Sequence, residues 1–339
     1  MLTSIKLLTK PSLKENAKIS VIVPCFNEEA VLPTLFDRLG KAASHWGSDY
    51  EILCVDDGSR DGTWELLKRQ NQKDPHWRCI SFARNFGHQI AVSAGLHYAK
   101  GDAMVVLDAD LQDPPEELSR FFEKWQAGYQ VVYAVRQKRK EPFTKRLCYW
   151  AFYRLMARMT PFPVPLDAGD FCLMDRQVVE IVKQMPERNR FVRGMRAWAG
   201  FRQIGVPYER QARAAGEPKY SFGKLLRLAW DGVSSFSTAP LRLATYLGFS
   251  VSTLAFFGAV LTFFQRIFAQ QLAKVNLALS PGFPTVVISI LFLGGVQLIC
   301  LGILGEYVGR IYDEVKHRPL WIVRDSAGIS AGPTQGPTV

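Results

Sequence analysis

Two carboxylates separated by one residue, Asp108 and Asp110, form the most distinctive chemical pattern in the sequence. They follow the apolar run 105–107, which has the composition of a buried strand. Side chains two positions apart on a strand point to the same side, so two like charges there raise each other's pKa. A divalent cation relieves that repulsion, and hard oxygen ligands suit Mg²⁺ or Mn²⁺, which also bridge to phosphates. We therefore expect a metal site here; the alternative is a solvated turn at the end of a strand.

Polar residues also follow two earlier strand-like runs. Asp56 directly follows the run 50–55, where its carboxylate is placed to accept hydrogen bonds from a nucleobase. Glu28 follows the run 19–26 and is expected to bind the base or the ribose. Asp61 lies in the glycine-containing stretch 56–63 and is expected to cap the next helix, which is a structural role.

These residues belong to a chain in which strand-like and helix-like runs alternate. The expected strands are 19–26, 50–55, 79–83, 103–107 and 131–135, and the expected helices are 29–44, 63–73, 89–99 and one that starts at Pro114. This rhythm predicts an α/β domain with a doubly wound, mainly parallel sheet, whose binding sites lie at the carboxyl ends of the strands. Neither G-x-G-x-x-G nor G-x-x-x-x-G-K-[ST] occurs, which counts against a dinucleotide enzyme and a phosphate-loop NTPase.

The carboxy-terminal third predicts a membrane domain. No charged residue occurs in the 23 positions between Arg242 and Arg266 or in the 20 positions of the run 286–305. A helix of 23 residues is about 34 Å long and crosses a hydrocarbon core of about 30 Å. Lys and Arg are more frequent before the first span and after the second than in the loop between them, so both ends are expected to face the cytoplasm. A buried helix of a soluble protein is the alternative for each span.

The amount and the distribution of positive charge also favour association with a membrane. The formal net charge is +11, and the window 136–158 holds eight basic residues and one acid. Apolar residues recur there at helical spacing, which favours an interfacial helix on an anionic membrane over a solvated charged helix. The stretch 222–242 is expected to be a second such helix. No nucleic-acid-binding signature accompanies the charge, so nucleic acid is not expected as a partner.

Taken together, five motifs resemble those of the membrane-bound family 2 glycosyltransferases: VIVPCFNEE, DDGSRDGT, ARNFGHQIAVSAGL, DADLQDPPE and RAAGEPKYSFGK. Within that family the chain resembles the polyprenyl-phosphate glycosyltransferases, which are dolichol-phosphate mannose synthase-like, and most closely the bacterial undecaprenyl-phosphate glucosyltransferases. The resemblance covers roughly residues 17–315. It implies a glycosyltransferase-A (Rossmann-like) fold, an inverting, Mg²⁺- or Mn²⁺-dependent transfer of glucose from UDP-glucose to undecaprenyl phosphate, and a homotetramer in the bacterial inner membrane.

The resemblance also implies roles for individual residues. In the nucleotide pocket it places Pro24, Asn27, Glu28 and Asp56, the last on the base. In the metal motif it places Asp108 and Asp110, with Asp110 and Gln112 as direct ligands. On phosphates and substrate it places Arg136, Arg213, Lys219, Tyr220 and Ser221. Pro218 stands where the family pattern has Ser or Thr, so one hydroxyl contact of that pattern is missing.

Asp167 and Asp170 are the remaining candidates for catalysis beside Asp110. Either carboxylate is placed to orient the attacking phosphate or the sugar hydroxyls, and Asp170 occupies the base-like position of the resemblance. A structural Asp at the start of a strand is the alternative for both. Other donors, GDP-mannose or a UDP-amino sugar, remain open, as does a non-catalytic nucleotide-sugar sensor or scaffold.

The expected organisation follows from these assignments. It comprises an amino-terminal tail (1–16), a cytoplasmic catalytic domain (17–221), a juxtamembrane helix (222–242), a two-helix membrane domain (243–311) and a cytoplasmic carboxy-terminal tail (312–339).

Overall fold

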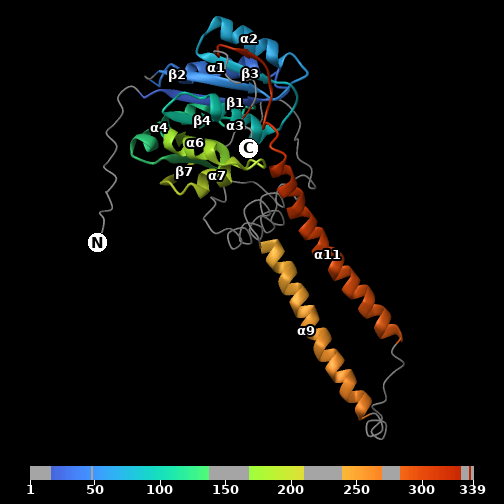
Figure 1. Cartoon of the computed structure of the whole chain (residues 1–339). Helices are drawn as coiled ribbons and strands as arrows, with labels where there is room; N and C mark the ends of the chain where they lie inside the picture. The colour runs from blue at the N-terminus through green and yellow to red at the C-terminus, as the bar shows by residue number, and fades with distance from the viewer. Residues whose placement is uncertain are drawn as a thin grey trace, which may run out of the picture. The chain divides into compact units, whose positions relative to one another are not determined.

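The computed structural model describes residues 17–46, 49–136, 168–209, 239–268, 283–329 and 336. The chain divides into two compact units, one formed by residues 1–225 together with 317–339 and the other by residues 226–316. The first is an α/β unit and the second contains two long helices (Figure 1).

The α/β unit is built on an eight-stranded sheet in the order β7-β5-β6-β4-β1-β2-β3-β8. Its centre is the parallel set β4-β1-β2-β3, whose strands are buried along their length because helices cover both faces. The strands are β1 (Ile19–Cys25), β2 (Tyr50–Asp56), β3 (Trp77–Phe82), β4 (Ala103–Val106), β5 (Val131–Arg136), β6 (Ala168–Asp175), β7 (Gln203–Tyr208) and β8 (Val323–Ala327).

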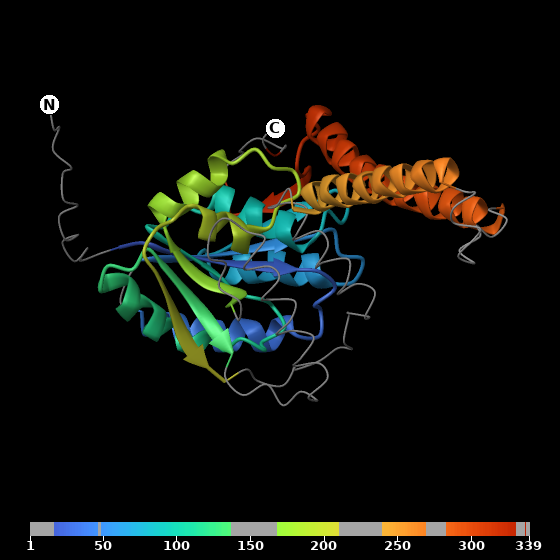
Figure 2. The ribbon, with the colours of Figure 1, turned by 90° about the horizontal axis from the view of Figure 1, so that it is seen from below.

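Helices cover the two faces of this sheet, as Figure 2 shows from below. Apolar side chains of α1, α2 and α4 join one core cluster with Ile52 and Cys54 of β2, whereas α3 packs against Leu53 and Val55 on the opposite face. The helices of this unit are α1 (Leu32–Ala43), α2 (Thr63–Lys73), α3 (His88–Tyr98), the 3-10 turn η1 (Pro115–Glu117), α4 (Leu118–Gln126), α6 (Arg176–Gln184) and α7 (Val192–Trp198).

Every strand and helix expected up to residue 135 is present, with ends shifted by a few residues. The expected cap of α2 is a partial match: the cap position is Gly62, but Asp61 Oδ1 accepts a hydrogen bond from the Thr63 N–H at 3.1 Å. The largest difference concerns the far side of the sheet. Strand β6 inserts between β4 and β5 and is antiparallel to both, so the sheet is mixed rather than mainly parallel at that side.

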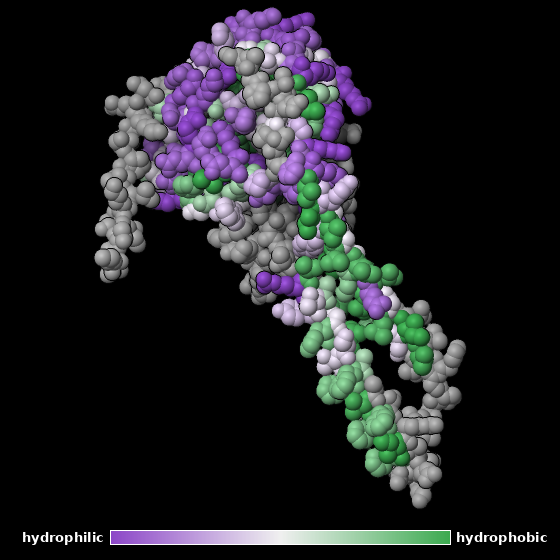
Figure 3. Space-filling model, viewed as in Figure 1, coloured by the Kyte–Doolittle hydropathy of each residue, from purple (hydrophilic) through white to green (hydrophobic). Residues whose placement is uncertain are grey.

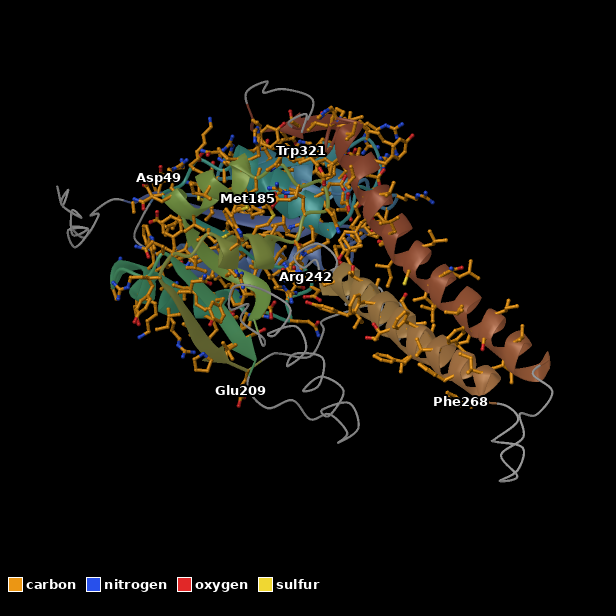
Figure 4. All side chains as sticks on the ribbon, turned by 60° about the horizontal axis from the view of Figure 1, so that its bottom comes forward. Asp49, Met185, Glu209, Arg242, Phe268 and Trp321 are labelled. Carbon is orange, nitrogen blue, oxygen red and sulfur yellow. The ribbon has the colours of Figure 1, made fainter. Side chains whose placement is uncertain are left out.

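The carboxy-terminal segment returns to the α/β unit. Strand β8 pairs antiparallel with β3, and the Ala83 N–H donates to the Ile322 carbonyl at 2.9 Å. Trp321, labelled in Figure 4, is 1% exposed and packs against the rings of Phe82 and His97 in an apolar cluster of this unit. Part of the predicted tail 312–339 is therefore an edge strand of the sheet, which the sequence analysis did not anticipate.

The described residues of the second unit form α9 (Ala239–Ile267) and α11 (Phe283–Val315). The two helices run in opposite directions (Figure 1), and Cys300 Sγ lies 3.8 Å from the Ala244 carbonyl oxygen. Arg242 and Phe268, labelled in Figure 4, lie near the two ends of α9. Both helices occur where the sequence predicts uncharged spans.

Apolar side chains of this unit face outward. Phe249 is 75% exposed, and Leu254 and Leu298 are each 72% exposed. Figure 3 shows the same two helices covered by hydrophobic residues, in contrast to the hydrophilic surface of the α/β unit. Both helices are long and apolar enough to cross a membrane, over Leu241–Gly258 and Ile288–Val315. The interfacial helices expected within 136–158 and 222–242 lie almost wholly outside the described residues.

Candidate active site

The loops after β1 and β2 are tied together by Asn27 and its neighbours. Asn27 has a φ of +54°, and its backbone N–H donates to Ser59 Oγ at 2.9 Å while its Oδ1 accepts from the Arg60 N–H at 3.0 Å. The Glu28 N–H donates to Thr63 Oγ1 at 2.9 Å. Asn tolerates the left-handed conformation better than most other non-glycine residues. Asn at position 27 therefore suits both the positive φ and the hydrogen bond that its side chain accepts. The two predicted pocket residues Asn27 and Glu28 are thus brought beside the Asp56 loop.

A glycine allows the loops after β2 and β3 to approach each other. Gly58 has a φ of +69°, and a Cβ at this position would lie 2.5 Å from the backbone carbonyl carbon of Arg84. Alanine at Gly58 should therefore destabilise the protein by about 2 kcal/mol, because both the φ and the contact are unfavourable. The thermal unfolding midpoint in detergent measures this effect.

Gly40→Ala is the matched control for this substitution. Gly40 lies within α1, and a Cβ there meets no heavy atom within 4 Å. Its replacement should leave the midpoint unchanged or raise it, since alanine is the better helix former. Equal midpoints for the Gly58 and Gly40 variants would contradict the close approach described here.

Asp56 and Asp57 are adjacent in the sequence, but their carboxylates accept hydrogen bonds from different segments. Asp56 is fully buried at the end of β2, and its carboxylate accepts from the Ser59 N–H at 3.0 Å and from Ser81 Oγ at 2.6 Å. The Asp57 carboxylate accepts from the N–H groups of Phe86 and Gly87, at 2.7 Å and 2.9 Å, and so fixes the entry to α3. Burial raises the pKa of Asp57 to about 6, although these backbone donors oppose the shift.

The D-x-D pair lies at the end of β4, as expected. Asp110 Oδ1 accepts from the Gln112 N–H at 3.2 Å, and Leu111 between them has a φ of +56°. Asp108 Oδ1 is a buried oxygen with no hydrogen-bond partner among the described residues. Burial raises the pKa of Asp108 to about 6. A buried carboxylate oxygen without a donor is unfavourable unless a ligand or ion completes its coordination.

His88, the first residue of α3, lies between two carboxylates. Its Nε2 is 3.7 Å from Asp108 Oδ1 and 3.5 Å from Asp170 Oδ2. Burial favours the neutral ring, but the hydrogen bond with Asp170 and the charge of Asp108 outweigh it and raise the pKa of His88 to about 9. An imidazolium at neutral pH therefore links the D-x-D motif to β6.

Asp170 is held by a bidentate ion pair on β6. Arg193 of α7 donates through Nε to Oδ1 at 2.8 Å and through Nη2 to Oδ2 at 3.0 Å, and Gln89 Nε2 donates to Oδ2 at 3.3 Å. Despite burial, the charge of Arg193 and the hydrogen bonds from His88 and Arg193 hold the pKa of Asp170 well below its usual range. Asp170 is consequently an ionised, oriented carboxylate and a weak proton acceptor at neutral pH.

These groups form one polar cluster at the carboxyl ends of β1, β2 and β4 and along β6. Among the described residues, no group of three or more His, Cys, Asp or Glu side chains is arranged to hold a metal ion. Mg²⁺ and Mn²⁺ sites that serve phosphates commonly need only one or two carboxylates, with water and the phosphates as the other ligands. Asp110 and Asp108 fit that donor set, since Asp108 Oδ1 accepts no hydrogen bond from the described residues.

The structure brings together part of the predicted set. Asn27 and Glu28 lie on the loop after β1, beside the end of β2 that holds Asp56. Asp108 follows β4 and Asp170 belongs to β6, and both lie near His88. Pro24 is buried within β1. Arg136 ends β5, but its side chain is not described. Asp167, Arg213, Lys219, Tyr220 and Ser221 lie outside the described residues.

Three residues of the cluster were missed by the sequence analysis. His88 and Gln89 stand in the quoted motif ARNFGHQIAVSAGL but received no role. Their position at the start of a helix after a strand was a usable signal. Arg193 has no recognisable motif around it, because its contact with Asp170 depends on the packing of α7 against β6.

The comparisons with known proteins agree with this site. Residues 20–182 match the model of glycosyl transferase family 2. An uncharacterized glycosyltransferase of Bacillus subtilis, YkcC, is 44% identical over 94% of this chain and 96% of its own length, and one of Synechocystis, sll0501, is 43% identical over 94% and 98%. The SfII prophage-derived bactoprenol glucosyl transferase of Shigella flexneri is 41% identical over 91% of this chain and 98% of its own length.

The fold and the site thus define a glycosyltransferase enzyme with a glycosyltransferase-A-type mixed sheet. More particularly, the chain belongs to glycosyl transferase family 2. The family and fold class predicted from the motifs are confirmed.

Proposed function

We propose that the protein transfers glucose from UDP-glucose to a polyprenyl phosphate, undecaprenyl phosphate, with inversion at the anomeric carbon. The observation that carries this proposal is the 41% identity, over nearly the full length of both chains, to a protein named for glucosyl transfer to bactoprenol. The acidic cluster at the end of β4 and the two apolar helices support it, since the reaction needs both a site for a diphosphate and access to a lipid.

Asp108, Asp110 and Gln112 would hold Mg²⁺ or Mn²⁺ at the end of β4. The buried oxygen of Asp108 that accepts no hydrogen bond within the described part of the chain supports this assignment. When bound, the ion neutralises charge that develops on the departing diphosphate. Pro24, Asn27, Glu28 and Asp56 would line the nucleotide pocket, with Asp56 on the base.

The acceptor needs orientation more than it needs a base. A phosphate monoester has a second pKa of about 6, so it is already anionic at neutral pH and acts as the nucleophile without losing a proton to the enzyme. Its oxygen forms a bond to C1 of the sugar as the C1–oxygen bond to UDP breaks, and UDP leaves with the electron pair. The fixed Asp170 would orient this nucleophile or the sugar hydroxyls, and Asp167 is the second candidate for that task.

Cationic and hydroxyl side chains would bind the phosphates of donor and acceptor. We assign this role to Arg136, Arg213, Lys219, Tyr220 and Ser221. His88 and Arg193 would keep the acidic cluster in place, since each contacts Asp170.

Helices α9 and α11 would span the bacterial inner membrane, with the catalytic domain and both termini in the cytoplasm. Their exposed apolar side chains support this placement. The interfacial segments within 136–158 and 222–242 would rest on anionic lipid. The catalytic domain would comprise residues 17–221 and the membrane domain residues 243–311. The protein would act as a homotetramer.

Full-length protein in detergent, Mg²⁺ and undecaprenyl phosphate should be incubated in turn with UDP-glucose, GDP-mannose and a UDP-amino sugar. We expect a lipid product heavier by one hexose with UDP-glucose alone, and a β-linked sugar by NMR, because inversion converts the α-linked donor. A product from GDP-mannose only would overturn the donor assignment. No product from folded protein with any donor would overturn the proposed function.

A further inference from the structure

The strand that follows the second long helix brings an arginine to the proposed nucleotide pocket. Arg324 of β8 donates through Nη2 to Ser81 Oγ at 2.9 Å, and the same nitrogen lies 4.0 Å from Asp56 Oδ2. Ser81 Oγ in turn donates to Asp56 Oδ2 at 2.6 Å. Arg324 is therefore joined to the proposed base-binding carboxylate through one hydroxyl, although 243 positions separate Arg324 from Ser81.

The position of Arg324 is fixed on both sides by contacts of its own segment. Trp321, three residues earlier, is 1% exposed in the core. Asp325 Oδ2 accepts from Trp64 Nε1 at 3.2 Å, and the Gly328 carbonyl accepts from Arg78 Nε at 3.1 Å. A side chain on so anchored a strand is preorganised, which is the condition under which a binding contact contributes most affinity.

The guanidinium has unused donors. The Arg324 side chain is 50% exposed, whereas that of Asp56 is 0% exposed. Within the described part of the chain, its one hydrogen bond is the one from Nη2 to Ser81, so Nε and Nη1 are open to a ligand. A buried acceptor next to an exposed donor matches the edge of uracil, which presents the N3–H donor beside the O4 acceptor. Cytosine presents the opposite arrangement.

We propose that Arg324 is a nucleotide-binding residue, which donates to a carbonyl of the nucleobase while Asp56 accepts the adjacent N–H. This inference rests on the proposed function and deepens it, because it makes the segment after the second membrane helix a part of the donor site.

The test measures nucleotide binding by the full-length protein in detergent, with UDP and CDP as probes and Arg324→Met as the variant. Methionine retains an apolar stem but has no hydrogen-bond donor. We expect the affinity for UDP to fall by about tenfold or more, as for a lost hydrogen bond to a charged group, and the preference for UDP over CDP to shrink. The affinity of Arg324→Lys for UDP should lie between that of Arg324→Met and that of the wild type, since lysine keeps the charge without the planar fork of donors.

Lys41→Ala is the matched control. It removes one positive charge from a side chain that is 73% exposed on α1, away from the pocket, and should bind both nucleotides like the wild type. Thermal unfolding of each variant shows whether β8 remains in place.

The inference is overturned if Arg324→Met binds UDP within twofold of the wild type, or if its affinities for UDP and CDP fall equally, as a purely structural role predicts. The transfer assay separates this failure from that of the proposed function. Wild-type protein that makes the glycolipid while Arg324→Met keeps its UDP affinity overturns the inference alone. Wild-type protein that makes no glycolipid overturns the function, whatever the variant binds.

Discussion

Alanine at Asp110 should lower the rate of sugar transfer by roughly a thousandfold, because it removes the carboxylate proposed to hold the divalent ion against the leaving diphosphate. The loss should fall on kcat and on kcat/KM, since neutralisation of the leaving group is needed most in the transition state. Transfer of labelled glucose to undecaprenyl phosphate measures it.

Asp37→Ala is the control for charge removal. Asp37 is 59% exposed on α1 and pairs with Lys41, so its loss should leave transfer unchanged. A second readout does not depend on turnover: binding of Mn²⁺ in the presence of UDP, followed by electron paramagnetic resonance. If the Asp110 variant transferred glucose at the wild-type rate, or bound Mn²⁺ with the wild-type affinity, the metal assignment would be refuted.

Alanine at Trp321 should lower the free energy of unfolding of the α/β unit by about 4 kcal/mol, as large-to-small substitutions of buried aromatic residues do. Trp321 is 1% exposed and packs with Phe82 and His97, so its removal leaves a cavity under β8. Thermal unfolding followed by intrinsic fluorescence in detergent measures the effect. Because β8 carries Arg324, the affinity for UDP should fall as well.

Trp198→Ala is the matched control, since this tryptophan of α7 is 60% exposed. Its replacement should change the unfolding midpoint by far less. A Trp321 variant as stable as the Trp198 variant would mean that the carboxy-terminal segment is not an integral part of the catalytic unit.

Local sequence patterns were sufficient to predict the strands in the first half of the sheet. Strands β1 to β4 are short apolar runs bounded by polar turns, and parallel strands buried on both faces have this composition whatever their neighbours are. Strand β6 was not among the expected strands, and the sequence analysis considered a strand there only as the alternative role for Asp167 and Asp170. Its residues Asp170 and Asp175 interrupt the apolar pattern, and each binds a side chain of another element, Arg193 for the first and Trp125 for the second.

The sequence by itself determined the chemistry of the D-x-D pair, its place at a strand end, the family, and the two long apolar helices, because each of these is encoded by neighbouring residues. Only the tertiary structure decided that His88 and Arg193 flank Asp170, that β6 inserts antiparallel, and that β8 returns to β3 with Arg324 beside Asp56. The reason is physical: these contacts join residues far apart in the sequence, and their free energy depends on packing that no local pattern specifies. Arg324 and Ser81, for example, are 243 positions apart.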